Sequence, residues 1–238
     1  MGVTKKPLDF FYQLNNHILE QVQDNPYLGI LINENLKWTT HINKITSKAS
    51  STLGFIRRNL KHCPRKLKET AYFSLIRSVL DYASTIWDPY LVKDINRLES
   101  VQRRAARFVC NNYHRDTSVS HLLTELKWTS LADRRREQRL ILHCKIINGL
   151  IEIPSEPHVT HSKYTRNSNS KGLNIIRSNT ETFRNSFFPR SVKDWNNLPD
   201  SCVLSPSVDS LKEGLAKVRL PPGLQKQCAP FFLGFNNQ

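Results

Sequence analysis

Residues 95–110 read INRLESVQRRAARFVC, and this stretch shows most directly how the chain folds. At about 100° per residue of an α-helix, its apolar and basic side chains separate onto two sides. The apolar side carries Ile95, Leu98, Val101, Ala105, Phe108 and Val109, and the basic side carries Arg103, Arg104 and Arg107 with Arg97 at its margin. The stretch therefore predicts an amphipathic helix whose apolar stripe packs on other helices. Its arginines are left to face water, acidic side chains or a phosphate backbone.

The same helical period extends to both sides of this stretch. From residue 40, Ile42, Ile45, Ala49, Leu53, Ile56 and Leu60 recur every three or four residues, and Thr39 or Thr40 can cap the helix. Pro64 begins a second helix, whose apolar residues cover more than one stripe, so we expect it to be largely buried. Shorter helices are predicted at residues 118–126, from Ser130 to Gly149, from Pro189, and within SPSVDSLKEGLAKV.

The first forty residues are β-rich instead. Alternating apolar residues in 9–32 are interrupted by Asn15-Asn16, and the run YLGILI is bounded by turn residues. We therefore predict a mainly α fold, in which a small antiparallel β-hairpin precedes a helical bundle and an irregular C-terminal helical cap follows it. The predicted divisions are residues 1–37 for the hairpin, 38–150 for the bundle, 151–220 for a loop and the helical cap, and 221–238 for a disordered tail.

Charge is the strongest global signal. The chain has 35 Lys and Arg against 20 Asp and Glu, a net charge of +15. Residues 41–149 hold 21 of the basic and 9 of the acidic residues, so this segment alone carries +12. A localised positive field favours a polyanionic partner, most often nucleic acid, sometimes an anionic membrane surface, although it can also serve solubility alone.

Five scattered cysteines, with no C-x-x-C spacing, predict free thiols in a reducing compartment and no zinc module. The start MGVTKKPLDF has no apolar segment of a secretory signal, and no apolar run approaches the ~20 residues of a membrane span. We therefore expect an intracellular protein, nuclear or cytoplasmic, that is not secreted and has no membrane partner.

Motifs for catalysis are missing from the sequence. Its Asp residues are isolated, and Asp81 and Asp88 are expected to be ordinary polar residues at a helix end rather than ligands of paired metal ions. The histidines form no H-E-x-x-H motif, and His143 and Cys144 are expected in a packed core. The four tryptophans are expected to anchor helix junctions, with base stacking as the alternative. No catalytic residue and no metal ligand is assigned.

The candidate site is a set of basic side chains on three helices that must pack together to bury their apolar stripes. If they face outward, they can line one groove and bind phosphates without reading bases. Ion pairing with Glu99, Glu125, Asp133 and Glu137, or capping of helix carbonyls by Arg134–Arg136, is the structural alternative. The predicted nucleic-acid-binding residues are Lys44, Lys48, Arg57, Arg58, Lys61, Arg103, Arg104, Arg107, Arg134, Arg135 and Arg136.

Several segments, in order, resemble one family. They are KKPLDFFYQL, HILEQV, PYLGILI, ITSKASSTLGFIRRNL, ETAYFSLIRSVLDYASTIWDPY, DINRLESVQRRAARFV, LKWTSLADRRREQRL and SFFPRSVKDWNNLP. Together they closely resemble the C-terminal part of the reverse transcriptases of jockey-like non-LTR retrotransposons, over roughly residues 3–215.

This resemblance implies a polymerase segment without its catalytic centre. In that family the palm subdomain carries an Asp-Asp pair, and this sequence has none. Residues 9–32 then resemble the palm edge that supports the primer end, and residues 39–150 the helical thumb. The resemblance implies a chain of an RNA-directed DNA polymerase family that is inactive alone and has no cofactor of its own, because Mg²⁺ belongs to the palm.

The implied partners are RNA and an RNA–DNA duplex, bound without sequence preference, together with the remainder of the polymerase. Two other interpretations stay open. One is a non-enzymatic helical module that binds an acidic protein partner, and the other is a remnant coding sequence whose product has no selected role.

Overall fold

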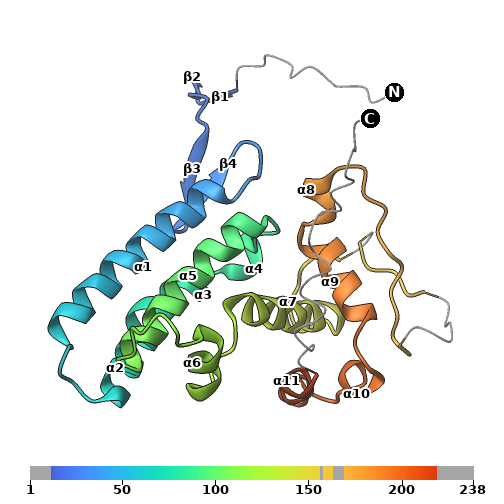
Figure 1. Cartoon of the computed structure of the whole chain (residues 1–238). Coiled ribbons are helices and arrows are strands. Elements are labelled where there is room, and N and C mark those ends of the chain that lie inside the picture. Colours follow the sequence, from blue (N-terminus) through green and yellow to red (C-terminus); the bar gives the residue numbers. More distant parts are fainter. Residues whose placement is uncertain (1–11, 156–157, 163–168, 219–238) are drawn as a thin grey trace, which may run out of the picture.

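The computed structural model describes residues 12–155, 158–162 and 169–218, and it is mainly helical (Figure 1). Two short antiparallel hairpins come first, formed by β1 (Gln13–Leu14) with β2 (His17–Ile18) and by β3 (Asp24–Tyr27) with β4 (Ile30–Asn33). The predicted fold class is confirmed, with two hairpins where one was expected. The tail predicted for residues 221–238 lies outside the described residues.

Both hairpins turn through two residues with positive φ. Asn15 and Asn16 have φ of 48° and 62°, and Leu28 and Gly29 have φ of 46° and 86°. Such turns match the right-handed twist of the strands that they join. Leu28 is an unusual residue for this conformation, and the hydroxyl of Tyr82 donates a hydrogen bond of 3.0 Å to its carbonyl oxygen. The second hairpin is thereby tied to the helical part of the chain.

Eleven α-helical segments and one π-helical turn follow the hairpins in the described part of the chain. They are α1 (Thr39–Asn59), α2 (Arg65–Tyr72), η1 (Phe73–Arg77), α3 (Ser78–Asp81), α4 (Ser84–Trp87), α5 (Val92–Val109), α6 (Val119–Glu125), α7 (Leu131–Ile147), α8 (Glu181–Arg184), α9 (Phe187–Asn196), α10 (Asp200–Val203) and α11 (Val208–Lys217).

The ends of α7 follow the sequence signals. The Ser130 hydroxyl accepts the backbone N–H of Asp133 at 3.0 Å, which is an N-cap, and Gly149 has a φ of 66° just beyond the helix.

A first hydrophobic core lies among α1, the α2–η1–α3 segment, α4, α5 and α6. The apolar stripe predicted on α5 is buried there, since Leu98, Val101 and Ala105 have no exposed surface. Trp87 is also fully buried, and its indole N–H donates to the Tyr82 carbonyl at 2.8 Å. Three of the four tryptophans are buried and Trp38 packs partly buried on this core, so their expected role as anchors is confirmed.

The second helix of the bundle contains a π turn that aligns its buried face. Its buried residues Lys68, Tyr72, Ile76 and Leu80 are spaced by four. In a regular α-helix four residues overshoot one turn by about 40°, so such a series would drift around the helix. The wider η1 turn corrects this drift and keeps Ile76 and Leu80 on the core side.

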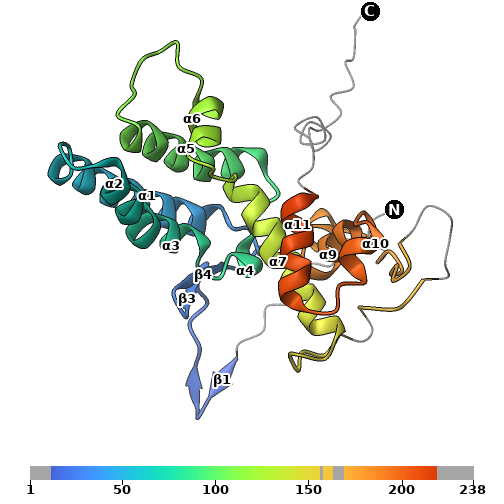
Figure 2. The ribbon, with the colours of Figure 1, turned by 90° about the horizontal axis from the view of Figure 1, so that it is seen from below.

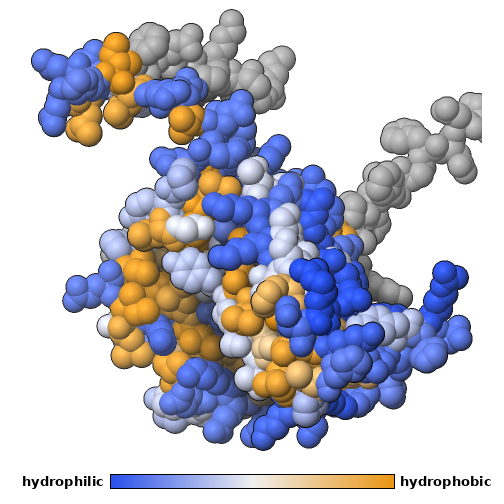
Figure 3. Space-filling view, turned by 90° about the vertical axis from the view of Figure 1, so that its left-hand side faces the viewer, coloured by the Kyte–Doolittle hydropathy of each residue, from blue (hydrophilic) through white to orange (hydrophobic). Residues whose placement is uncertain are grey.

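This helix is only half buried, so the prediction that it is largely buried was wrong. Leu67 and Leu75 are 47% and 48% exposed. One side of the helix packs on α1 and α5, and α7 reaches only its C-terminal end, so Leu67 and Leu75 on the other side stay exposed. Figure 3 shows hydrophobic side chains gathered on this face of the molecule.

A second core lies at the other end of α7. Leu140 and Cys144 of α7 pack there with residues of α9, α10 and α11. Figures 1 and 2 both show α7 lying between the two groups of helices. The predicted boundary between the bundle and the C-terminal cap falls after residue 150, at the end of α7. In the structure, α7 contributes residues to both cores.

The segment after α7 is partly packed on this core. The Asn169 amide donates to the Trp195 carbonyl at 2.7 Å, and the Trp195 indole N–H donates to the Lys171 carbonyl at 3.1 Å. His161 and Leu173 form an isolated antiparallel bridge. The loop predicted here thus contributes ordered contacts on both sides of residues 163–168.

Leu80→Ala tests the buried face that the π turn aligns. Because Leu80 is fully buried, its truncation leaves a cavity, and we expect the free energy of unfolding to fall by about 2–5 kcal/mol. Urea denaturation measures the loss. Leu75→Ala, in the same helix segment but half exposed, is the matched control and should cost about 1 kcal/mol or less. Equal losses in the two variants would contradict the assigned helix face.

Candidate nucleic-acid interface

Helices α1 and α5 lie side by side and run in the same direction. The Thr39 hydroxyl donates to the Asp94 carboxylate at 2.8 Å near their N-termini, and an Arg104 guanidinium N–H donates to the Ser50 hydroxyl at 2.9 Å further along. The sequence separation of the paired residues is nearly the same in the two contacts, 55 and 54 positions. It would change along an antiparallel pair, so the two helices are parallel. We call the exposed strip along this contact, from Ser47 and Arg97 to Gly54, the α1–α5 seam.

A pocket of about 440 Å³ lies where both helices end. Three of its lining residues are cationic and two are aromatic, and no carboxylate lines it. The guanidinium of Arg57 lies 5.4 Å from the ring centroid of Tyr113, a cation–π contact. The lining residues are Gly54, Arg57, Arg58, Lys61, Phe108, Asn111 and Tyr113, and we call this the basic pocket.

The seam itself has small polar residues on α1 and arginines on α5. Helix α1 contains no acidic residue. The two carboxylates of α5 are both engaged, Asp94 by Thr39 and Glu99 by the backbone N–H of Ala132 at 2.9 Å. Arg104 therefore has only neutral hydrogen-bond partners, Ser50 and the Ser100 carbonyl, and keeps its charge uncompensated.

The other two arginines predicted on α5 differ from each other. Arg103 is exposed, donates a 3.4 Å hydrogen bond to the Asn96 carbonyl, and has an electrostatic interaction with Glu99 but no ion pair within the described ranges. Arg107 donates to the carbonyls of His114 and Thr117 at 2.9 and 3.3 Å. Arg107 thus ties α5 to the loop before α6, while Arg103 is available at the surface.

Lys44 and Lys48 are exposed, and neither lines the basic pocket. At about 100° per residue, Lys48 lies two and a half turns before Arg57 and so on the opposite side of α1. Lys44 lies within about 40° of Arg58 by the same count, but fourteen residues, or about 21 Å, earlier along the helix. Both lysines are therefore separate from the cluster of Arg57, Arg58 and Lys61, Lys48 by its side of the helix and Lys44 by its distance along it.

The arginines predicted on α7 are occupied within the chain. Arg134 donates to Asp81 at 2.7 Å, and Arg136 lies 3.4 Å from Asp194. Arg135 is 1% exposed and pairs with Asp88 at 3.0 Å. The prediction that Arg135 faces a phosphate groove was wrong, because α7 crosses between the two cores and turns this side inward.

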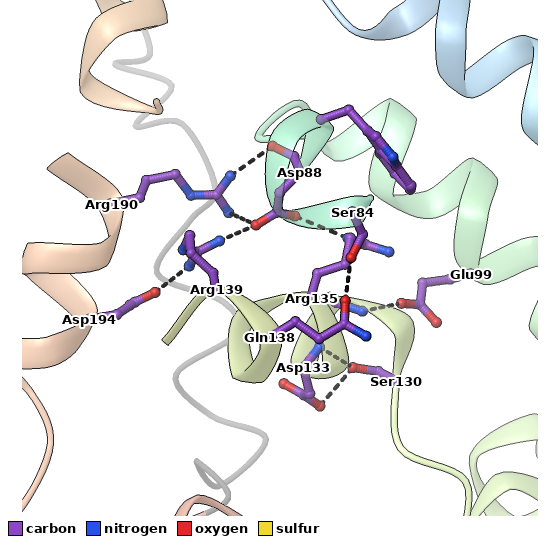
Figure 4. Close-up of polar contacts among 12 residues, drawn as sticks. Ser84, Asp88, Glu99, Ser130, Asp133, Arg135, Gln138, Arg139, Arg190 and Asp194 are labelled. Carbon is purple, nitrogen blue, oxygen red and sulfur yellow. Dashed lines mark hydrogen bonds and ion pairs between the residues drawn. The ribbon is translucent and has the colours of Figure 1, made fainter. Parts of the chain in front are cut away.

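Asp88 is the centre of this inward-facing network (Figure 4). Its carboxylate pairs with Arg135 and Arg139 of α7 and with Arg190 of α9, the last at 3.2 Å. Asp194 accepts from Arg139 as well. The ion-pair partners of these arginines are Asp81, Asp88 and Asp194, which are distant in sequence and were not among the carboxylates expected to pair with them.

Two residues of the interface were missed from the sequence. Tyr113 was not selected because it lies in a loop, although it follows the arginine helix by only a few residues. Arg97 was placed at the margin of the basic face, yet it lies seven residues before Arg104 and so on the same side of α5, exposed. The seven-residue spacing is the signal that could have identified it.

His143 and Cys144 are buried, as expected for packed core residues. In the described ranges, no group of three or more His, Cys, Asp and Glu side chains is placed to hold a metal ion. Within those same ranges no helix has an apolar run long enough to cross a bilayer. Comparison with family models, with curated proteins and with solved structures finds no match to this chain.

Asp88→Asn tests the network that joins the two cores. The variant leaves the buried guanidinium groups of Arg135 and Arg139 and the partly buried one of Arg190 without their shared counter-charge, and an arginine cannot lose its proton to compensate. We expect the free energy of unfolding to fall by about 3–5 kcal/mol in urea denaturation. Asp209→Asn is the control, because Asp209 is exposed and pairs only with Lys212, and its unfolding midpoint should stay unchanged. An unchanged midpoint in Asp88→Asn would contradict the role of this carboxylate.

A second prediction concerns pH. Burial, with the Arg139 charge nearby, lowers the pKa of His143 to about 4. Between that pKa and the ordinary value of 6.5 the unfolded chain binds a proton that the folded chain does not. Stability is therefore lost as the pH falls from about 6.5 to about 4, by about 3 kcal/mol for this group.

His143→Leu should remove this part of the pH dependence. The measurement is the difference in unfolding free energy between variant and wild type at pH 7.5, 6 and 5. The exposed His62→Leu is the control and should follow the wild type throughout. If His143→Leu retains the full pH dependence, His143 is not the group responsible.

Proposed function

We propose that this chain holds RNA or an RNA–DNA duplex through phosphate contacts, as the thumb and downstream region of a non-LTR retrotransposon reverse transcriptase. The observation that carries the proposal is the basic pocket, in which Arg57, Arg58 and Lys61 converge beside Tyr113 with no carboxylate among the lining residues. Guanidinium and ammonium groups in this arrangement suit phosphate oxygens, and the tyrosine suits a base or sugar face.

The α1–α5 seam supports the same proposal. Arg104 and Arg103 extend the positive charge of the basic pocket along parallel helices, and the neighbouring Ser47, Ser50 and Gly54 leave room for a strand to approach. Backbone contacts of this kind fix the position of a nucleic acid without reading its sequence. In this proposal the catalytic carboxylates and their Mg²⁺ belong to the palm, so the chain acts by positioning its substrate.

The structural role of these cations alone is a weaker explanation. Arg57 and Arg58 lie in the last turn of α1, where positive charge stabilises the helix dipole by about 0.3–1 kcal/mol. That effect needs one cation at one helix end. It does not explain why Lys61 and an aromatic residue from another loop gather at the same pocket.

Binding of a fluorescent RNA–DNA duplex, measured by anisotropy at several salt concentrations, tests the proposal. About four to five phosphate contacts predict a slope near −4 in a plot of log K against log salt. Arg57→Gln combined with Arg58→Gln should reduce the slope by about 2 and weaken binding about tenfold or more, because each cation neutralises about one phosphate.

The matched control is Lys44→Gln combined with Lys48→Gln, which removes the same charge from the same helix but outside the basic pocket. We expect it to keep the wild-type slope and affinity to within about twofold. If both double variants lose binding equally, binding depends only on the net charge of the chain, and the assigned surface is wrong. A wild-type slope near zero would instead favour the alternative, a module that binds an acidic protein.

A further inference from the structure

A second pocket lies at the junction of the two cores and is lined by arginines. It has a volume of about 130 Å³ and lies where α7 meets the α4 segment and the start of α9. Two guanidinium groups line it, those of Arg139 and Arg190. The other lining residues are Leu36, Trp38, Thr85, Ile86, Asp88, Tyr90, Thr182, Asn185, Ser186 and Phe187, and we call this the arginine pocket.

Positive charge exceeds negative charge around the arginine pocket. Arg135, Arg136, Arg139 and Arg190 share the two carboxylates Asp88 and Asp194. Glu99 lies within electrostatic reach of Arg135, but burial raises the pKa of Glu99, and its oxygen already accepts the Ala132 N–H. Among these residues, four cations face three carboxylates even when Glu99 is counted.

Part of this positive charge is buried, which makes it costly, and part lies nearer the surface, since the side chains of Arg136 and Arg190 are 23% and 24% exposed. Arg139 is 2% exposed, and the pKa of Arg190 is lowered by its burial and by the charge of Arg139. A guanidinium group keeps its charge in proteins, so an uncompensated one in the interior calls for a counter-anion.

Hydrogen-bond donors are also left over at this junction. The Nε of Arg139 and both terminal nitrogens of Arg135 are buried without a hydrogen-bond partner among the described residues. The Asp88 carboxylate faces the pocket too, but Arg135 occupies its Oδ1 and Arg139 and Arg190 share its Oδ2. Thr85, Thr182 and Tyr90 also line the pocket, and their hydroxyl groups can act as neutral donors.

We propose that the arginine pocket binds a phosphate-class oxyanion, held by the guanidinium groups of Arg139 and Arg190 and by the hydroxyls that line the pocket with them. A tetrahedral oxyanion matches this site because it accepts several hydrogen bonds and offsets the surplus charge. The volume admits one such ion with little room to spare. The proposal is independent of the nucleic-acid function, because no residue of the basic pocket takes part.

Calorimetric titration of the chain with inorganic phosphate, at constant ionic strength set with sodium chloride, tests this site. We expect saturable binding by the wild type, and variants of the arginine pocket identify the site. Arg190→Gln should weaken binding at least tenfold, because it removes a charged donor. Thr85→Leu should do the same by filling the pocket, and it breaks no ion pair. Lys212→Gln removes an exposed cation of α11 that lines neither pocket, and it should bind as the wild type does.

The result that overturns the proposal is either no saturable binding by the wild type or undiminished binding by folded Thr85→Leu. If Arg190→Gln fails to fold by circular dichroism, Thr85→Leu decides alone. Two sources can supply the anion, free phosphate or the terminal phosphate of a strand. A 5′-phosphorylated oligonucleotide that competes with inorganic phosphate, when its unphosphorylated form does not, identifies the strand end. If neither form competes, the free ion is the ligand.

Discussion

Asp88 holds the junction between the two cores because it is the counter-charge shared by three arginines from two different helices. Arg135 and Arg139 reach it from α7 and Arg190 reaches it from α9. The Arg190 guanidinium also donates to the backbone carbonyl of Asp88 at 3.0 Å. Buried guanidinium groups stay charged and must find oxygen acceptors. The path of α7 between the two cores therefore depends on this one carboxylate.

The same network explains why the outer surface is so positive. The interior arginines occupy Asp81, Asp88 and Asp194, which consequently cannot neutralise cations elsewhere. Arg57, Arg58 and Arg103 are left exposed, and no ion pair of theirs is found in the described part of the chain. The two groups of arginines thus have different roles. One group joins the two cores through ion pairs, and the other makes the molecular surface positive.

The positions of the helices and their ends could be predicted well from the sequence. What their polar faces contact could be predicted less well. The apolar stripe of α5, the Ser130 cap and the Gly149 stop follow local rules of period and backbone conformation, so they could be predicted. Whether a polar helix face meets water or another core is decided by elements far along the chain. Arg135 and Asp88 are 47 residues apart, and Arg139 and Asp194 are 55 apart. The angular separation of apolar and basic residues identified the exposed arginines of α5. It could not show that the arginines of α7 face another core, nor that Lys44 and Lys48 lie apart from the basic pocket.

The parallel register of α1 and α5 has a consequence for the order of folding. Two helices joined by a short connection lie antiparallel, so a parallel pair needs the whole segment from residue 60 to residue 91 as a crossover. The two hydrogen bonds between them span 55 and 54 positions, which makes closure entropically slow. During synthesis α1 emerges before α5, and its apolar side can then pair with β4 and with the half-buried helix that comes next. We therefore expect a helical hairpin of α1 with α2–η1–α3 to form first. Helix α5 completes the bundle only after its last turn has been synthesised.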